Sequence, residues 1–363
     1  MLNFNDIFVD DTKYGMKIPK EKYLSVGLYP VIDQSKEQIA GYTDESEGIY
    51  CDVPAIIFGD HTRIIKYIDV PFFLGADGTK LLKIKDNTAF NCKYLYYALS
   101  NAKIPNTGYN RHFKWLKELS FNIPSIEKQR EIADLMDIIV NLENLRKKQL
   151  EKLELFVKSR FIEMFGDPIT NTKRWPADKV EAVCSNIYGG GTPSKSKEEY
   201  WNGDIPWISS KDMKSDMISD SQIRITNLGL DNSSAKLVPI NSVIMVIRSG
   251  ILKHTLPVAI NTVPVTVNQD LKVFIPSVSI HYRFLAFLFK MLEKDILAGV
   301  RAVTADNIEF DTLKNRKIIL PPVQLQNQFA SFVTQVDKSK LAIQQSLDEL
   351  ETLKKSLMQQ YFG

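Results

Sequence analysis

Apolar residues recur at helical spacing along two long segments, and the rest of the chain is organised around them. The first segment runs from Pro124 to Gly166 and the second from Pro321 to Gly363. Proline suits the first turn of a helix and glycine commonly ends one, and beyond the opening prolines neither residue interrupts either segment. The pattern therefore predicts one long helix in each segment.

The two segments also match each other at a constant offset and without a gap. The identical pairs are Pro124/Pro321, Gln129/Gln326, Ala133/Ala330, Leu150/Leu347, Leu153/Leu350, Glu154/Glu351, Lys158/Lys355, Ser159/Ser356, Phe165/Phe362 and Gly166/Gly363. Because no insertion separates the copies, their length is held equal. We therefore expect the helices to act as rulers that set a distance.

In the second segment an apolar residue recurs every seven positions, which is typical of a helix that pairs with another helix. These residues are Phe329, Val336, Ile343, Leu350 and Leu357, with Phe332, Leu347 and Leu353 beside them. The first segment has a poorer version of the pattern, which Arg146 and Gln149 interrupt. Neither helix would be stable alone in water, and a globular segment lies between them. We therefore expect the two helices to pair as an antiparallel coiled coil.

The residues before each long helix are predicted to form a β-rich domain. Short apolar runs between Gly- and Asp-bearing turns are typical of strands, and one amphipathic helix follows them in each domain. The strand-like runs are Tyr29–Ile32, Ala55–Phe58, Arg63–Tyr67, Val243–Ile247 and Val263–Val267, and the helices are 93–99 and 282–289. The sequence thus predicts an α+β fold with approximate two-fold symmetry. Its parts are two β-rich domains, 1–122 and 167–319, and the long helices that follow them, 123–166 and 320–363.

Composition narrows the class of protein. The 363 residues are 44% hydrophobic and 25% charged, with a net charge of +3, which are ordinary globular values that hint only mildly at an acidic partner. Cys51, Cys92 and Cys184 are far apart and odd in number, so they indicate neither a disulfide framework nor a zinc cluster. No apolar run is long enough to span a membrane, and the start lacks the pattern of a signal peptide. We expect a soluble protein of the cytoplasm.

Motifs for catalysis are weak. Gly189–Ser196 ends in Lys-Ser like a phosphate-binding loop, but Ser194 stands where that loop needs glycine and Pro193 lacks a backbone N–H. The four histidines show no pair at metal-ligand spacing, and there is no Gly-x-Ser-x-Gly elbow. We therefore expect no catalysis by this chain alone, no metal site and no cofactor bound to it.

Polar and basic residues in loops point instead to DNA. Arginine can form two hydrogen bonds with guanine, asparagine can do so with adenine, and Ser or Thr can bind phosphate or a base. The candidates are His61, Thr62, Arg63, Asn106, Tyr109 and Arg111 in the first domain, and Thr192, Lys195, Ser209, Lys211, Arg248 and Lys253 in the second. Each residue taken alone is more often a solvated loop tip than a DNA contact. Their recurrence at comparable places in both domains favours DNA reading.

Several segments together resemble the DNA-specificity subunits of type I restriction and modification systems, over essentially the whole chain. Ile123–Ile132 and Leu320–Phe329 resemble that family's helix openings, and Ser356–Gly363 resembles its C-terminal ending. Gly189–Ser194 with Tyr200–Ile208 resembles one variant of its target-recognition domain, and Tyr29–Ile32 with Ile57–Thr62 resembles another.

The resemblance implies a non-catalytic subunit that recognises a bipartite sequence in double-stranded DNA. It implies that 1–122 and 167–319 are the two target-recognition domains. It also implies two methyltransferase subunits that use S-adenosylmethionine, and restriction subunits that use ATP and Mg, as partners. One departure is that the chain begins almost directly at its first domain, so we expect no contribution from a longer N-terminal segment.

Two alternatives stay open on the residues alone. A coiled-coil scaffold whose β-rich domains bind proteins would show no sequence-selective binding to DNA. A nuclease or methyltransferase with an unrecognised site would show turnover by the purified chain.

Overall fold

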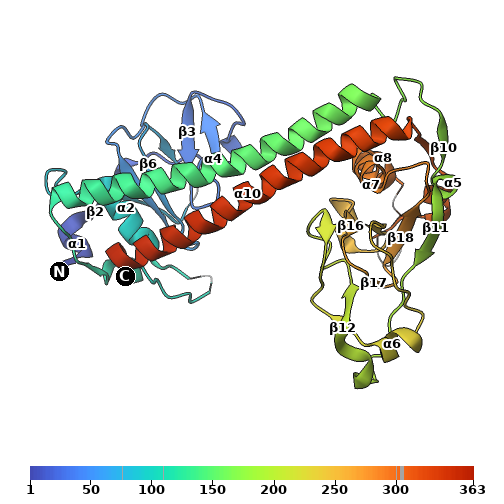
Figure 1. Cartoon of the computed structure of the whole chain (residues 1–363). Coiled ribbons are helices and arrows are strands. Elements are labelled where there is room, and N and C mark those ends of the chain that lie inside the picture. The colour runs from blue at the N-terminus through green and yellow to red at the C-terminus, as the bar shows by residue number, and fades with distance from the viewer. Residues whose placement is uncertain (76, 109, 300, 303–305) are drawn as a thin grey trace. The chain divides into compact units, whose positions relative to one another are not determined.

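The chain forms two compact units, each assembled around part of both long helices (Figure 1). The computed structural model describes residues 1–75, 77–108, 110–299, 301–302 and 306–363. The first unit consists of Met1–Lys148 together with Ile343–Gly363, and the second of Gln149–Ala342. The first unit is therefore made of two pieces that are far apart in the sequence.

The two long helices are present as expected. Helix α4 spans Ile126–Phe165 and α10 spans Val323–Phe362. Gly166 follows α4 with a φ of 76°, a left-handed conformation that favours glycine, and its N–H donates to the Ile162 carbonyl at 2.7 Å. The glycine predicted to end the first helix therefore does so through its backbone freedom.

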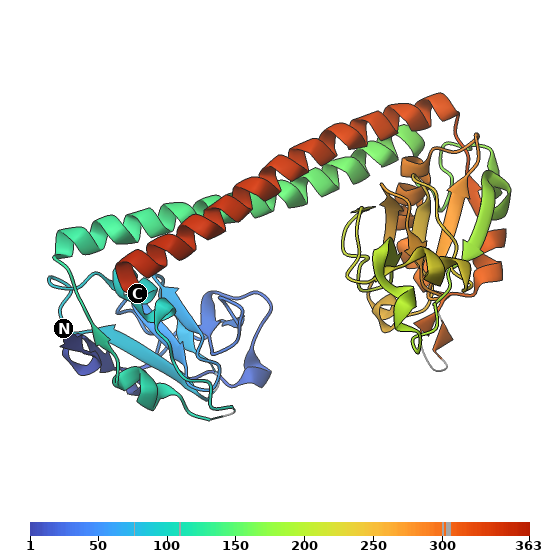
Figure 2. The same cartoon turned by 60° about the horizontal axis from the view of Figure 1, so that its bottom comes forward.

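The helices run antiparallel in both units (Figure 2). In the first unit, Lys354 near the end of α10 lies 2.8 Å from Glu143 in the first half of α4. In the second unit the Phe156 ring, late in α4, packs 5.1 Å from the Phe332 ring, early in α10. Early turns of one helix meet late turns of the other in each case, which confirms the predicted pairing. Leu353, expected at the contact, is instead half exposed.

The first unit contains a four-stranded antiparallel sheet in the order β2-β8-β5-β6 and a three-stranded sheet in the order β4-β3-β7. Helix α2 contacts β5 and β6. The bounds are β2 Phe8–Asp10, β3 Tyr29–Ile32, β4 Gly41–Thr43, β5 Ala55–Gly59, β6 Ile65–Ile68, β7 Phe73–Leu74, β8 Thr79–Ile84 and α2 Cys92–Asn101. Strand β5 is buried along its whole length, as its unbroken apolar run predicts.

The second unit repeats this plan with one more edge strand. Its sheets have the orders β11-β18-β15-β16-β13 and β14-β12-β17, and α7 packs on β15, β16 and β18. The bounds are β11 Cys184–Gly189, β12 Trp201–Ile208, β13 Met217–Ile218, β14 Arg224–Ile225, β15 Val243–Val246, β16 Val258–Asn261, β17 Thr266–Val267, β18 Leu271–Pro276 and α7 Tyr282–Met291. The repeated topology confirms the α+β fold with two related domains.

Each domain closes on itself by pairing its first strand with its last. The pairs are β1 with β9 and β10 with β21. The remaining bounds are β1 Leu2–Asn3, α1 Phe4–Ile7, α3 Phe113–Lys117, β9 Ser120–Phe121, β10 Ala177–Lys179, α5 Val180–Val183, α6 Asn227–Asp231, α8 Glu293–Leu297, β19 Arg301–Ala302, β20 Asp306–Asn307, α9 Phe310–Asn315 and β21 Lys317–Ile319. Helix α8 lies within the longer segment that the second domain carries after its amphipathic helix.

A buried glutamine joins each long helix to the domain before it. Gln326 accepts a hydrogen bond from the His281 backbone N–H at 2.8 Å and donates to the carbonyls of Ser279 and Pro321 at 3.2 and 2.8 Å. These bonds satisfy backbone groups at the start of α7 that the helix itself leaves unpaired. The identity of Gln129 and Gln326 between the two long segments therefore has a structural reason.

Gln129 makes the same set of bonds in the first unit. Its Oε1 accepts from the Asn91 N–H at 2.8 Å, and its Nε2 donates to Ala89 and Pro124 at 3.0 and 2.9 Å. Both glutamine side chains are almost fully buried. The two units therefore share a residue-level joint as well as a strand order.

Candidate nucleic-acid interface

Three loops meet at one end of the sheets in the first unit. One loop follows β3, the second connects β5 to β6, and the third connects β7 to β8. The Asp60 N–H donates to the Gly78 carbonyl at 2.7 Å, and the His61 N–H donates to Gln34 Oε1 at 3.1 Å. The backbone N–H groups of Asp60 and His61 thus connect the three loops, the second of them through the Gln34 side chain.

A fourth loop, which precedes α3, is fixed to the same point by a buried histidine. The His112 backbone N–H donates to the Asp60 carbonyl at 2.8 Å, and His112 Nδ1 lies 3.0 Å from the same oxygen. Because a carbonyl only accepts, Nδ1 carries the proton and Nε2 is left to accept from Thr107 Oγ1 at 3.4 Å. Asp60 Oδ1 also accepts from the Phe113 N–H at 2.7 Å. Asp60 and His112 therefore organise this end of the unit.

The structure brings four of the candidates in the first unit close together. His61, Thr62 and Arg63 form the turn after β5, and the Arg111 guanidinium lies 4.0 Å from the Asp60 carboxylate with 79% of its side chain exposed. The Arg63 guanidinium donates to the Ile104 carbonyl at 3.3 Å, so it ties the turn to the neighbouring loop.

The other two candidates of the first unit belong to the loop before α3. Asn106 is exposed, and its Oδ1 accepts from the Gly108 N–H at 3.2 Å. Tyr109 lies outside the described residues. Only the oxygen of the Asn106 side chain takes part in this bond, and its NH2 group does not.

The second unit uses equivalent backbone bonds at the corresponding end. The Ile247 N–H donates to the Asp270 carbonyl at 2.9 Å, and the Ile308 N–H donates to the Ile247 carbonyl at 2.9 Å. The strands pair in the same register as in the first unit, so Ile247 corresponds to Asp60 and Asp270 to Gly78. The backbone arrangement is kept while the side chains on it differ.

Three candidates of the second unit gather around residues 268–270. Thr192 donates through its hydroxyl to Gln269, and Arg248 forms an ion pair with Asp270 at 2.6 Å. Ser209 directly follows β12, whose last carbonyl accepts from the N–H of residue 268 at 2.9 Å, and its hydroxyl donates to Asp212 at 2.7 Å. The segment 268–270 therefore organises this end of the second unit.

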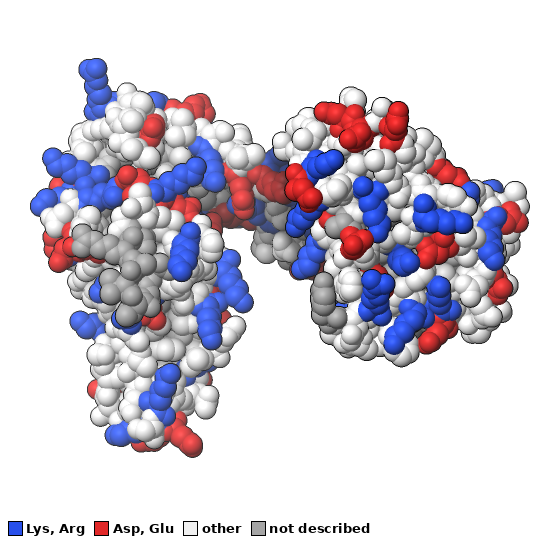
Figure 3. All heavy atoms as spheres, turned by 180° about the vertical axis from the view of Figure 1, so that it is seen from behind, with Lys and Arg blue, Asp and Glu red and all other residues white. Residues whose placement is uncertain are grey.

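The remaining candidates are exposed lysines on the flanking loops. Lys195 lies in a loop that is held by a hydrogen bond from the Trp201 indole N–H to the Ser194 carbonyl at 3.1 Å. Lys211 follows Ser209, and Lys253 ends the short 3-10 helix after Arg248. Figure 3 shows Lys and Arg side chains over the visible face of each unit, interleaved with Asp and Glu. Such cations can add attraction for phosphate without reading a sequence.

The glycine run before Lys195 serves close packing. A Cβ at Gly190 would lie 2.0 Å from the Val267 carbonyl oxygen, and one at Gly191 would lie 2.4 Å from the Ala235 nitrogen. The Gly191 carbonyl also accepts from the Trp207 indole at 2.9 Å. The run therefore lets the backbone pass against β17 and seats an aromatic side chain.

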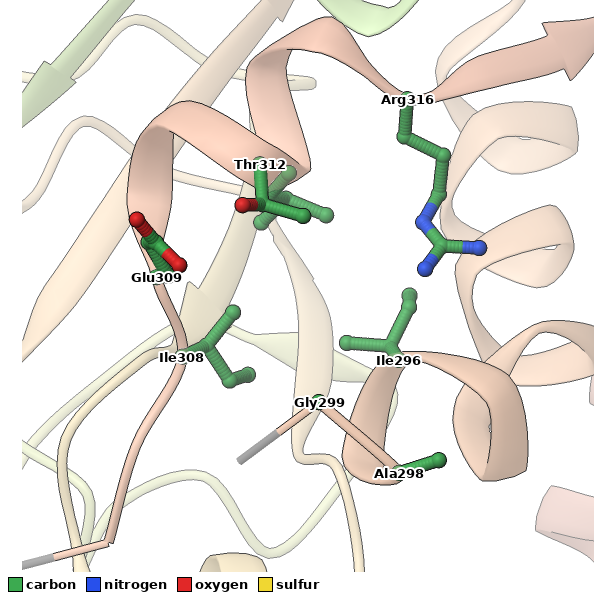
Figure 4. Close-up of a pocket in the computed structure, with 8 residues that line it drawn as sticks. Ile296, Ala298, Gly299, Ile308, Glu309, Thr312 and Arg316 are labelled. Atoms are coloured by element: carbon green, nitrogen blue, oxygen red, sulfur yellow. The ribbon is translucent and has the colours of Figure 1, made fainter. Parts of the chain in front are cut away.

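One pocket of about 390 Å³ lies in the second unit between α8 and α9 (Figure 4). Ile296, Ile308 and Thr312 line it, and Arg316 stands at its wall. The Arg316 guanidinium is already paired with Asp295. The lining mixes aliphatic side chains with the polar groups of Glu309, Thr312 and Arg316, and it shows no evident chemistry.

Two of the cysteines are buried thiols. Burial raises the pKa of Cys92 and of Cys184 to about 12, so both stay protonated at neutral pH and lack the thiolate that a nucleophile or metal ligand requires. Among the described residues, no group of three or more His, Cys, Asp or Glu side chains is placed to hold a metal ion. No helix in the described part of the chain is both long and apolar enough to cross a membrane.

Sequence reasoning missed Gln34, Gln269 and Asp270, which hold the interface loops in place. Each of them lies within a few residues of a short apolar run, at the point where a strand begins or ends. That position is the only signal that could have identified them. Their partners come from loops that the sequence does not place side by side.

Comparison with known proteins identifies the family. The family model for the type I restriction modification DNA specificity domain matches residues 3–155 and 178–352. The chain is 30% identical over 347 residues to the type I restriction enzyme EcoR124I/EcoR124II specificity subunit of Escherichia coli, covering 93% of this chain and 85% of the relative. It is 32% identical over 173 residues, 46% of this chain and 38% of the relative, to the MjaIX specificity subunit of Methanocaldococcus jannaschii.

Solved structures agree on the fold. The S subunit of the type I restriction-modification system from M. genitalium superposes with a TM-score of 0.67 at 16% identity, covering 99% of this chain and 95% of that one. A chain from a structure on complex assembly and conformational transition of the type I R-M system gives 0.59 at 16% identity, covering 99% and 96%. At these identities the likeness concerns the fold. With the family model and the relative from E. coli, the chain belongs to the family of DNA specificity subunits of type I restriction–modification systems.

Proposed function

We propose that this chain is the non-catalytic subunit that selects a bipartite DNA sequence, each unit reading one half. The observation that carries this proposal is the repeated interface, in which equivalent backbone bonds at the same sheet end of both units display different side chains. A shared frame with variable side chains suits two readers that recognise different bases.

The bases would be read by exposed side chains on these loops, and the phosphates would be held by the flanking lysines. Arg111 and Asn106 in the first unit, and Arg248 in the second, carry the donors that suit base edges. His61, Thr62, Thr192 and Ser209 are further members of the proposed contact surface. Lys195, Lys211 and Lys253 are exposed cations that suit phosphate oxygens.

The partners would be two methyltransferase subunits docked on the long helices. Apolar side chains that the helix pair leaves exposed are Ile138 and Leu145 in the first unit and Leu155 and Leu341 in the second, each more than half exposed. Exposed apolar side chains on a helix suit a further helix laid alongside. Restriction subunits would join the resulting complex. S-adenosylmethionine, ATP and Mg would be bound by these partners.

The test is methylation by the complex. We expect that co-expression of this chain with a methyltransferase subunit of such a system produces methylation at one bipartite sequence, detected by methylation-sensitive sequencing. The purified chain alone should incorporate no labelled methyl groups and should bind that sequence in a salt-dependent manner. Methyl transfer by the chain alone would contradict the proposal. A complex whose methylation ignores sequence would instead favour the protein-binding scaffold.

A further inference from the structure

The Arg248 side chain is held in one orientation by a chain of hydrogen bonds. Arg248 Nε and NH2 lie 2.7 and 2.6 Å from Asp270 Oδ1. Asp270 Oδ2 accepts from Asn268 Nδ2 at 3.1 Å, and the Asp270 N–H donates to Asn268 Oδ1 at 3.1 Å. Asn268 is only 6% exposed and is anchored through its own backbone to β12. A buried residue thus fixes the carboxylate, and the carboxylate fixes the guanidinium.

Among the described residues, Asp270 is the side-chain partner of the Arg248 guanidinium, which leaves the outer edge available. The Nε–H and one N–H of NH2 point at Asp270, so the outer edge presents one N–H from each terminal nitrogen. The Arg248 side chain is 49% exposed. Two parallel donors on a planar group match the O6 and N7 acceptors that guanine presents in the major groove.

We propose that Arg248, oriented by Asp270, reads a guanine in the half-site bound by the second unit. The inference rests on the proposed function and adds the base, the reading residue and its positioning residue. Holding a flexible arginine in place before binding reduces the side-chain entropy lost on contact, and the fixed direction of its donors favours the base whose acceptors match them. Asp270 therefore contributes to specificity without touching DNA.

A phosphate contact explains the pair less well. The Asp270 carboxylate next to the guanidinium reduces the net charge of the pair and repels a phosphate brought close to it. A base edge is neutral overall and is read through the direction of its acceptors, which the carboxylate leaves unchanged. The ion pair therefore lowers attraction for the DNA backbone while it keeps the geometry for a base.

Arg63, the candidate arginine in the turn after β5, differs from Arg248. The Arg63 guanidinium is half-buried and bonds to the Ile104 carbonyl, so its role is to hold the neighbouring loop. At the position equivalent to Arg248 the first unit has His61, and at the position of Asp270 it has Gly78, which has no side chain. We therefore expect this mode of guanine reading in the half-site of the second unit.

The experiment compares methylation motifs of complexes that carry variants of this chain. Arg248→Lys keeps the positive charge but loses the two parallel N–H donors, and Asp270→Asn removes the carboxylate charge. Asp220→Asn is the matched control, because Asp220 also pairs with an arginine of the second unit, Arg224, at 2.8 Å, and Arg224 lies on the edge strand β14 outside the proposed contact surface. Melting curves of each complex show whether the variant remains folded.

We expect the complex with Arg248→Lys to lose its requirement for one guanine in one half-site, with methylation of the other three bases there rising at least tenfold relative to guanine. Asp270→Asn should act at the same base with a smaller effect. Asp220→Asn should leave the motif unchanged, and the half-site bound by the first unit should be unaffected by all three variants.

Two results would overturn the inference. One is an Arg248→Lys complex that stays folded and keeps the full motif, and the other is a uniform loss of methylation over all sequences, which marks a phosphate contact. Both leave the proposed function intact, because the unaltered complex still methylates one bipartite sequence. If the unaltered complex has no motif, the proposed function itself fails.

Discussion

At the scale of single residues, the two buried glutamines show why identical positions can recur in a duplicated chain whose domains diverge. Gln129 and Gln326 each satisfy three backbone groups that belong to two different elements. No other side chain of that length offers one acceptor and two donors in the neutral state. The domain ahead of each helix can therefore change its surface but not this joint.

We predict that Gln326→Leu lowers the free energy of unfolding of the second unit by about 2 kcal/mol, because it leaves buried backbone groups without partners. Urea unfolding of the purified chain gives the loss, and hydrogen exchange locates it near the start of α7. Gln328→Leu is the control, since Gln328 is exposed on the same helix. Equal effects of the two substitutions would contradict the assigned role.

The capping residue of α7 gives the second unit a sensitivity to acid. His281 Nδ1 accepts from the Arg283 N–H at 3.1 Å, which requires a neutral ring. Burial, and then the charge of Arg283, hold its pKa below the ordinary value of 6.5. The folded state then binds fewer protons than the unfolded state, so the contribution is complete above about pH 6.5 and is lost as the pH falls below it.

We therefore predict that the second unit loses stability between pH 7 and pH 5, and that His281→Asn removes part of this loss. Asparagine is already used at the equivalent cap, where Asn91 Oδ1 accepts from the Tyr94 N–H at 2.9 Å. Melting temperatures measured over this pH range for both proteins test the prediction. Parallel pH profiles for the two would show that the cap does not titrate in this range.

At the scale of elements, the two paired helices share a largely buried ion pair in the first unit. Glu143 is 7% exposed and accepts from Lys354 at 2.8 Å, while its Oε1 has no hydrogen-bond partner among the described residues. A buried ion pair is seldom a large source of stability, but it penalises registers that leave the carboxylate alone. The pair therefore favours one alignment of the helices in the first unit.

We predict that Lys354→Met destabilises the first unit by about 2 kcal/mol, because it leaves the Glu143 carboxylate buried without a partner. Adding Glu143→Leu should restore most of the stability, since both sites are then apolar. Denaturant unfolding of the single and double variants measures the difference. A single variant as stable as the parent chain would show that the carboxylate reaches water.

The elements were largely predictable from the sequence, whereas the interface was not. Proline, glycine and the seven-residue repeat located both long helices, and unbroken apolar runs located β5 and β15. Periodicity is a local signal, so it reports an element but not its neighbours. Asp60 and Asp270 act through partners in other loops, and their importance appears only when the strands are aligned.

At the scale of the whole molecule, each unit carries its own set of candidate interface loops. We predict that exchanging residues 1–122 for the first domain of another member of the family changes one half of the methylated sequence and leaves the other half unchanged. The incoming domain must keep an aromatic residue at the position of Tyr94, which packs 5.1 Å from Phe362. Methylation-sensitive sequencing decides, and a change in both halves would refute independent reading.

The discontinuous first unit has a consequence for the order in which the protein folds during synthesis. The ribosome releases residues 1–148 early, but the helical stretch that completes their core is Ile343–Gly363. The second unit is the continuous stretch Gln149–Ala342, so it can finish folding before the first. Chains stopped at Ala342 should therefore show a protease-resistant second unit and cleavage within 126–148, and equal protection of both would exclude this order. The part of the protein that is made first is then completed last. Until that moment the apolar face of its helix is uncovered and prone to aggregation.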